Sequence, residues 1–407
     1  MQNAPRGLPL TAGRPQIGIG GCQISDRGRE LVGEVLDSNR LSAGPMTDRF
    51  ERMIAAAHDR RYALMCSSGT SALQIAVQAL KEIGGWADGD EVLVPAVTFI
   101  ATSNVVLYNG LKPVFVDVDP EFYEIDPAQI ERHITPRTRA IIPVHVAGLP
   151  CDMDPILEIA RRRRLRVIED SAEAMFVRYK GRPVGSFGDV ACFSTYIAHL
   201  ITTGVGGLCV TDDPEIEVLL KSIMNHGRDS LYTRIDDDQG MEGDSLLEVA
   251  RSRFSFVRLG HSFRATEMEA ALGVAELERR EETTARRQAV VARLTRGLAP
   301  WAHLLQLPRP RPEAEHLPMF FPLRILDPRI TRDDLIRHLE DRSIETRYLL
   351  PLINQPIYRK LFGDLEPRYP VAASLNRTAF YVGCHPWMSD EDVDYVAECF
   401  AEFFRGL

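Results

Sequence analysis

The sequence predicts an α/β protein with a large, mostly parallel sheet covered by helices on both faces, followed by a smaller α+β unit. Short apolar runs rich in Val and Ile alternate with helical patterns between residues 60 and 215, as in doubly wound folds. A proline-rich break at residues 307–312 then precedes a different pattern, with one strand-like run and two amphipathic helices. The length of 407 residues suits about two domains, each with its own core.

The elements are expected in a defined order along the chain. Strands of the large sheet are predicted at residues 62–66, 91–96, 113–118, 140–146, 166–169, 190–194 and 208–211. Helices are predicted at 71–83 and, as one long element, at 265–300, and the acidic stretch 236–244 is predicted as an exposed loop. The smaller unit contains a strand at 319–325 and helices at 332–342 and 389–405. We therefore expect an N-terminal segment 1–45 that packs with the small domain, a large domain 46–275 and a small domain 276–407.

Composition excludes several classes of protein. The net charge of −9 argues against a nucleic-acid partner, and the basic run 161–164 is typical of a solvated helix face. The seven cysteines are scattered and form no CxxC pair, so neither a disulfide framework nor a metal site is indicated. Residues 1–13 are too polar for a secretory signal, and no apolar run approaches the ~18 residues of a membrane span. We expect a cytoplasmic protein.

Two polar features fall at the carboxyl ends of predicted strands, where open α/β sheets place their ligands. Ser68, Gly69 and Thr70 stand between a strand and a helix, where small residues leave backbone N–H groups free to bind an anion. The alternative is that a hydroxyl here only caps the helix. Asp170 follows the strand predicted at 166–169, and its carboxylate can pair with a protonated ring nitrogen of a ligand. Its alternative is an ordinary turn residue.

Two further features point to the same edge of the sheet. Phe99 follows a strand directly, so its ring can stack on an aromatic ligand, although such a side chain is more often part of the core. Ser194 ends another strand and can hold a phosphate group. His199 follows it in an apolar stretch that leads into the glycines of residues 204–207; an isolated histidine in such a stretch is more often structural.

Several segments, taken in order, carry a resemblance to a known family. They are residues 41–45, SSGTSAL at 67–73, VPAVTFIAT at 94–102, FVDVD at 115–119, residues 135–145 and IEDSAEA at 168–174. Together they resemble the DegT-type sugar aminotransferases (DegT/DnrJ/EryC1/StrS) over nearly the whole chain. The resemblance implies the type I fold of pyridoxal-phosphate-dependent transferases, like aspartate aminotransferase, in which the large domain binds the cofactor. It also implies a homodimer and pyridoxal or pyridoxamine 5′-phosphate as the cofactor.

The resemblance also implies roles for individual residues. Asp170 would pair with the pyridine nitrogen, Phe99 would stack on the ring, and Glu173 stands where family aminotransferases carry a Gln near the ring hydroxyl. The phosphate would be held by Ser68, Gly69, Thr70 and Ser194. Ser262 replaces an Asn that reaches the phosphate of the partner subunit's site, and Arg347 and Tyr348 would face the substrate.

The chain departs from the family at the residue that normally bonds the cofactor. The family's lysine is His199 here, and the glutamate of its glycine-rich segment is Val205. Imidazole has no primary amine, so the cofactor would bind non-covalently. The five lysines are Lys81, Lys112, Lys180, Lys221 and Lys360, and none follows the phosphate-binding serine. A complete transamination cycle is therefore not expected.

This substitution resembles the family's nucleotide-sugar 3-dehydratases, which are also similar at residues 259–271, 344–347 and 380–386. Their iron–sulfur branch uses four cysteines, but the aligned positions here are Ala172, Ser230, Tyr232 and about Gly240, so no cluster is expected. The resemblance implies removal of the C3 hydroxyl of a 4-keto-6-deoxy nucleotide sugar, with His199 as base and glutamate regenerating the amine form of the cofactor. An imidazole pKa near ~6.5 would suit that base.

Two alternatives remain open from the sequence. One is a sugar aminotransferase-like enzyme with an atypical site, which works slowly without the lysine. The other is a catalytically inactive relative that binds the cofactor or a partner. The presence of Asp170, Phe99 and Ser194 together argues against the second alternative, because folding alone does not require them.

Overall fold

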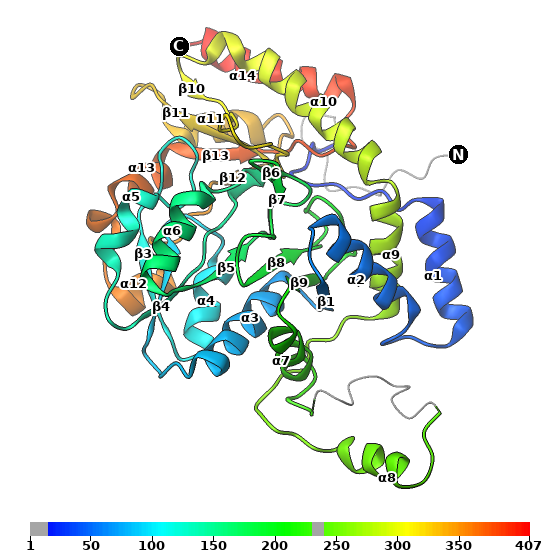
Figure 1. The fold of residues 1–407 in the computed structure, drawn as a ribbon. Helices are drawn as coiled ribbons and strands as arrows, with labels where there is room; N and C mark the ends of the chain where they lie inside the picture. Colours follow the sequence, from blue (N-terminus) through cyan, green and yellow to red (C-terminus); the bar gives the residue numbers. More distant parts are fainter. Residues whose placement is uncertain (1–14, 230–239) are drawn as a thin grey trace.

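The computed structural model describes residues 15–229 and 240–407. A seven-stranded sheet in the order β1-β9-β8-β5-β4-β2-β3 forms the centre of the large unit (Figure 1). The pairs β2–β3, β2–β4, β4–β5 and β5–β8 are parallel, whereas β9 runs antiparallel to both of its neighbours. The strands are β1 (Tyr62–Cys66), β2 (Glu91–Pro95), β3 (Lys112–Val116), β4 (Thr138–Ile141), β5 (Arg166–Asp170), β8 (Val190–Ser194) and β9 (Gly207–Thr211). The predicted, mostly parallel sheet is confirmed.

The strands are apolar on both sides because helices cover both faces of the sheet. Val92 and Val94 of β2 pack into the core beneath α3, whereas Leu93 between them packs into a second core that contains Ile156 of α6. The helices of this unit are α2 (Pro45–Ala57), α3 (Gly69–Gly84), α4 (Ile100–Tyr108), α5 (Pro127–Ile130), α6 (Met153–Arg163) and α7 (Pro214–Met224). The strand predicted at 140–146 ends at Ile141, close to Pro143, which has no N–H to donate to a neighbouring strand.

The C-terminal part folds around a second sheet, of order β10-β11-β13-β12, which is antiparallel throughout. Its strands are β10 (Leu305–Gln306), β11 (Phe321–Ile325), β12 (Thr346–Tyr348) and β13 (Ala379–Val382). The helices are α10 (Arg280–Leu298), α11 (Arg332–Glu340), α12 (Pro356–Phe362), α13 (Pro370–Thr378) and α14 (Asp390–Arg405). Helices α10 and α14 pack on each other above this sheet (Figure 1). A short hairpin of β6 (Arg178–Tyr179) and β7 (Arg182–Pro183) belongs to neither sheet.

One predicted helix is wrong in its extent. The single helix at 265–300 is two helices, α9 (Glu267–Glu278) and α10, which meet at Arg279. Their partners differ, because α9 packs against α1 (Asp26–Ser38) and α2 while α10 packs against α14, so one straight helix could not serve both. Of the loop predicted at 236–244, residues 236–239 lie outside the described residues. The last two positions belong to helix α8 (Gly243–Ser252).

The N-terminal segment contacts both units. Ile17 pairs with Ile344 and belongs to the core beneath the small sheet, whereas α1 packs against α9. The division at residues 45 and 275 stays a prediction. Among the described residues, no helix has the length and apolar character needed to span a lipid bilayer.

Candidate active site

The N-terminus of α3 has the form of an anion site. Ser68 is the N-cap, and its Oγ accepts a hydrogen bond of 3.0 Å from Ser71 N, while its carbonyl accepts one from Ala72 N. Within the described residues, the backbone N–H groups of Gly69 and Thr70 donate to no protein atom. Ser68 is therefore both the cap and one edge of a site in which two N–H groups and the helix dipole favour a phosphate.

Glycines allow Ser194 to lie against this helix end. A Cβ on Gly69 would stand 2.7 Å from Ser194 Cβ, and a Cβ on Gly207 would stand 2.2 Å from the carbonyl oxygen of Ser68. Both distances are shorter than packed carbon atoms allow, so a larger residue would push the helix start and the ends of β8 and β9 apart. The structure thus brings together Ser68, Gly69 and Ser194, as predicted for phosphate binding.

Asp170 is buried at the carboxyl end of β5, in register with Cys192 of β8. Its Oδ2 accepts a hydrogen bond of 2.7 Å from Thr102 Oγ1, and its Oδ1 accepts one of 3.2 Å from Ala172 N. Burial raises the pKa of Asp170, and the hydrogen bond from Thr102 acts in the opposite direction. A buried carboxylate that keeps an oxygen available to a cationic ring nitrogen would gain from that partner. Thr102, which lies one turn after Phe99 in the VPAVTFIAT segment, was not among the predicted site residues.

Phe99 is the N-cap residue of α4, and 60% of its surface is exposed. The interpretation of this side chain as core is therefore wrong. Its carbonyl accepts a hydrogen bond from Thr102 N, so the ring lies within one helical turn of the side chain that holds Asp170. An exposed ring close to the residue that holds Asp170 suits the stacking role that the resemblance implies.

Glu173 is buried, and its Oε2 accepts a hydrogen bond of 2.8 Å from Ala147 N. Burial raises its pKa to about 8, and the nearby charge of Asp170 adds to this effect. Near pH 7 the carboxyl is therefore mostly neutral and carries an O–H that can donate a hydrogen bond. In this form Glu173 resembles the Gln of the family aminotransferases in both shape and charge.

His199 lies in a turn beyond Ser194, in which His199 N donates to Tyr196 O at 2.9 Å. The side chain is half-buried, and its Nδ1 is buried without a hydrogen-bond partner among the described residues. Burial lowers the pKa of the imidazole to about 4; the backbone of Tyr196 opposes this change, and the charge of the buried Arg287 adds to it. In the protein alone, the pKa of His199 therefore lies below the unperturbed value of 6.5, because the ring has lost water without gaining an anionic partner. The imidazole is neutral near pH 7, which is the state that a base requires.

Three further predicted residues form contacts with residues outside this group. Ser262 is exposed, and its Oγ accepts a hydrogen bond of 3.1 Å from Arg264. Arg347 and Tyr348 are exposed on β12, where Arg347 forms an ion pair with Glu345. Their predicted roles at the partner subunit's phosphate and at the substrate remain predictions.

Tyr381 of β13 is influenced by charges from both units, and no role was predicted for it from the sequence. It pairs with Arg347 in the register of β12 and β13, and its ring stacks on Phe320 with centroids 3.9 Å apart. Burial raises the pKa of its phenol, with a further contribution from the charge of Glu173, while Arg347 opposes the change. The phenol is therefore within electrostatic range of both Glu173 and Arg347, which are predicted to face the cofactor and the substrate. The only signal for it was the similarity to the 3-dehydratases at 380–386.

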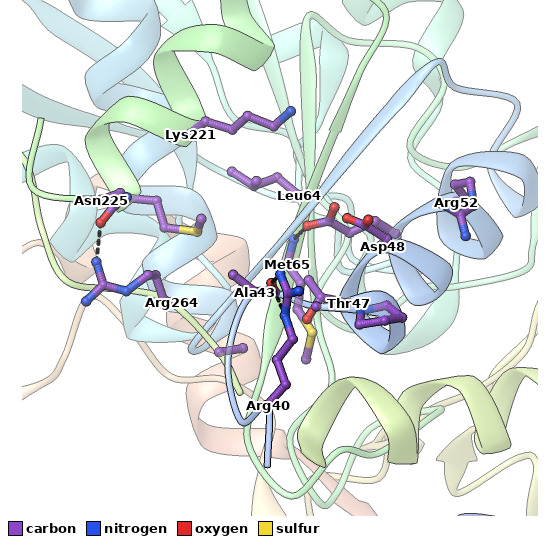
Figure 2. A pocket seen from close by; sticks show the side chains of 15 residues that line it. Arg40, Ala43, Thr47, Asp48, Arg52, Leu64, Met65, Lys221, Asn225 and Arg264 are labelled. Carbon is purple, nitrogen blue, oxygen red and sulfur yellow. Dashed lines mark hydrogen bonds between the residues drawn. The ribbon is translucent and has the colours of Figure 1, made fainter. Parts of the chain in front are cut away.

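A cavity of about 420 Å³ lies elsewhere, beside β1 and the start of α2. Figure 2 shows its lining, which includes Lys221, Arg40 and the hydrogen-bonded pair Asn225 and Arg264. None of the residues predicted to hold the cofactor lines it, so cavity size does not locate the site.

The group around Asp170 fits a pyridoxal-phosphate-type cofactor bound without a covalent bond. Among the described residues, the N–H groups free at the start of α3 suit the phosphate, the buried carboxylate suits a cationic ring nitrogen, and His199 Nδ1 has no hydrogen-bond partner. Four of the five lysines form ion pairs with acidic side chains: Lys81, Lys112, Lys180 and Lys221. The fifth, Lys360, is exposed on α12. Across the described residues, no group of three or more His, Cys, Asp or Glu side chains has metal-site geometry.

Comparison with known proteins agrees with this geometry. The model of the DegT/DnrJ/EryC1/StrS aminotransferase family matches residues 23–401. GDP-perosamine synthase of Caulobacter vibrioides is 34% identical, covering 94% of this chain and 96% of its own. The dTDP-4-dehydro-2,6-dideoxy-D-glucose 3-dehydratase of Saccharopolyspora spinosa is 32% identical, covering 97% and 88%. The solved structure of E. coli GDP-4-keto-6-deoxy-D-mannose-3-dehydratase with bound hydrated PLP is 26% identical, with a TM-score of 0.81 over 94% and 98% of the chains.

Proposed function

The chain belongs to the DegT/DnrJ/EryC1/StrS aminotransferase family of pyridoxal-phosphate-dependent enzymes, and on this premise we propose that it is a nucleotide-sugar dehydratase. The proposed reaction removes the C3 hydroxyl of a 4-keto-6-deoxy nucleotide sugar. One observation carries the proposal: the half-buried imidazole of His199, whose Nδ1 has no hydrogen-bond partner among the described residues, occupies the turn after Ser194 in place of a primary amine. Two of the relatives compared above are themselves named 3-dehydratases.

The proposed chemistry divides between the cofactor and the protein. When bound, pyridoxamine phosphate supplies the amine that condenses with a keto group and a ring that accepts electrons. His199, neutral near pH 7, accepts a proton from the carbon that carries this amine and later returns one. Such proton transfer is typically worth about 10²–10⁴-fold in rate. The O–H of neutral Glu173 donates toward the ring hydroxyl, and Asp170 holds the ring nitrogen protonated.

We propose that glutamate restores the amine form, because the sequence has no cysteines at the aligned iron–sulfur positions. The same imidazole serves both half-reactions, since each moves one proton at the same carbon. The cytoplasm, the compartment expected from the sequence, would supply this amino donor.

The second candidate is an aminotransferase that works without the lysine. It is favoured by the similarity to GDP-perosamine synthase, which covers 94% of this chain. The two candidates differ in product, because a dehydratase yields a deoxy sugar with release of water and ammonia, whereas an aminotransferase yields an amino sugar. An inactive relative would bind the cofactor and yield neither.

We further propose that the site is completed in a homodimer. Phe254 and Leu259, on the segment leading to Ser262, are 82% and 89% exposed, which is unusual for large apolar side chains. A second copy covering this segment would bury them and bring Ser262 to the neighbouring site. Size-exclusion chromatography with light scattering is expected to show a dimer, and a monomer at working concentration would rule out this part of the proposal.

The main experiment incubates the protein with pyridoxal phosphate, glutamate and a panel of GDP-, CDP- and dTDP-4-keto-6-deoxy sugars. Mass spectrometry is expected to show a product that has lost the C3 oxygen, together with 2-oxoglutarate and ammonia. His199→Asn is expected to lower both half-reactions by about 10²-fold or more. His303→Asn, at an exposed histidine far along the chain, is the matched control and is expected to change neither. An amino sugar as the stable product would favour the second candidate. If the protein reacts neither with any of the sugars nor with glutamate, the result would support the third possibility, a catalytically inactive relative.

A further inference from the structure

The segment that precedes α1 runs as an extra edge beside the small sheet. Ile17 N donates to Ser343 O at 2.8 Å, and Ile17 O accepts from Glu345 N at 2.9 Å. Ile19 N then donates to the side chain of Glu345, at Oε2, over 2.9 Å. Figure 1 shows this segment, in dark blue, passing toward β12 and β13 before the chain enters α1. One end of the segment is therefore held by the residues just before β12.

The other end of the segment touches the turn that carries His199. A Cβ on Gly20 would stand 2.8 Å from Ala198 Cα and 2.9 Å from Ala198 Cβ. A Cβ on Gly21 would stand 3.1 Å from the ring of His385. Packed carbon atoms do not approach below about 3.0 Å without displacement, so the Gly20 backbone rests directly on the backbone of Ala198. Ala198 immediately precedes His199. The placement of the Gly20 backbone therefore affects the placement of the turn that carries His199.

We propose that residues 17–21 form a strap that positions His199, with Gly20 as the positioning residue. The inference rests on the proposed function, in which His199 moves the proton. Any shift of the Ala198 backbone turns the imidazole, because His199 N is tied to Tyr196 O inside the same short turn. Gly20 is required here for space, since no side chain fits between the two backbones.

The strap also links His199 to the expected substrate side. Glu345 accepts from Ile19 N through one carboxylate oxygen and pairs with Arg347 through the other. Arg347 is the residue expected to face the nucleotide sugar. Glu345 anchors the strap through Ile19. A substrate that draws Arg347 away from Glu345 would change this anchor and therefore the position of the His199 imidazole. The same carboxylate thus couples substrate binding to the placement of the imidazole.

Gly20→Ala tests the strap, and Gly33→Ala in α1 is its matched control, because a Cβ on Gly33 meets no atom within 4 Å. In the protein without cofactor, ¹³C-histidine NMR follows the His199 signal, assigned by its loss in His199→Asn. The wild-type imidazole is expected to titrate near pH 4. In Gly20→Ala the displaced ring regains water, and its titration is expected to move toward ~6.5. Gly33→Ala is expected to match the wild type.

Kinetics give the second readout. Gly20→Ala is expected to lower kcat of the glutamate half-reaction by about 10- to 10²-fold while cofactor affinity changes less than about twofold, because a misplaced base loses rate without losing binding contacts. Adding Ala198→Gly removes the clash with the methyl group of Ala198 but leaves the clash with its backbone, so partial recovery is expected. Glu345→Gln weakens the anchor without a clash, and it is expected to move the titration in the same direction by a smaller amount.

Each outcome decides the proposal. The proposal of a strap would be overturned if the His199 signal titrates at the same pH in Gly20→Ala as in the wild type. It would also be overturned if Gly33→Ala shifts that titration by an equal amount. If circular dichroism shows that Gly20→Ala does not fold, the Glu345→Gln titration decides instead, and an unchanged signal there overturns it. If the wild-type protein has no turnover, the proposed function fails, but the NMR comparison still accepts or rejects the strap.

Discussion

Replacing Glu173 by Gln is expected to remove a pH dependence from the stability of the cofactor-free protein. Burial raises the pKa of Glu173 from 4.5 to about 8, so the folded protein keeps this proton at pH values where the unfolded chain releases it. Below about pH 4.5 both states hold the proton, and the contribution to stability is complete. As the pH rises toward 8 only the unfolded state ionises, so wild-type stability falls. Glutamine keeps the shape and the acceptor for Ala147 N but cannot ionise.

The magnitude follows from the two pKa values. At about 1.4 kcal/mol for each pH unit, the interval from 4.5 to about 8 is worth about 5 kcal/mol when fully developed. Two-state linkage places about 3.5 kcal/mol of this between pH 5 and pH 8. Urea unfolding followed by circular dichroism, at four pH values in this range, measures the free energy of unfolding of both proteins. The variant is expected to gain about 3.5 kcal/mol relative to the wild type as the pH rises.

Glu158→Gln is the matched control, because its side chain is 66% exposed and its ion pair with Arg162 lies at the surface. Its stability is expected to follow the wild type within about 0.5 kcal/mol at every pH, since exposed pairs contribute little. A constant difference between wild type and Glu173→Gln across the pH range would refute the reasoning, because it would mean that Glu173 ionises in the folded protein as readily as in the unfolded chain.

Three further predictions concern cofactor affinity, measured by fluorescence titration with pyridoxal phosphate. Gly69→Ala places a Cβ 2.7 Å from Ser194 and is expected to weaken binding at least about tenfold, whereas Gly33→Ala leaves it unchanged. Thr102→Val removes the hydroxyl that donates to Asp170 and is expected to weaken binding by about 10-fold; an unchanged affinity would show that this hydrogen bond does not prepare the carboxylate. Phe99→Ala is expected to cost about 0.5–1.5 kcal/mol of binding, and full affinity would exclude stacking.

The fold class was predictable because it depends on local patterns. The two-sided burial of β2 appears in the sequence as an unbroken apolar run, and the parallel pairing of most strands follows from the helical patterns between them. The break at Arg279 was not predictable, because α9 and α10 have compatible helical patterns and part only where their packing partners change.

The placement of Asp170 and Ser194 at one sheet edge was also predictable, since both end strands of a parallel sheet. Their surroundings were not. Thr102 reaches Asp170 from 68 residues away in the chain, and Ala147 N reaches Glu173 from a separate turn. Hydrogen-bond partners of this kind depend on which loops meet, and the periodicity of a segment carries no information about them.

The sequence by itself determined the chemical groups: a histidine and no lysine after Ser194, an acid where a Gln is usual, and glycines where the chain must pass closely. The tertiary structure alone decided their state. It buries Glu173 and His199 in surroundings that withhold water, which keeps both side chains neutral near pH 7, and it lays Gly20 on Ala198. The reason is physical: the identity of a side chain is local, whereas its charge and position depend on the distant segments that surround it.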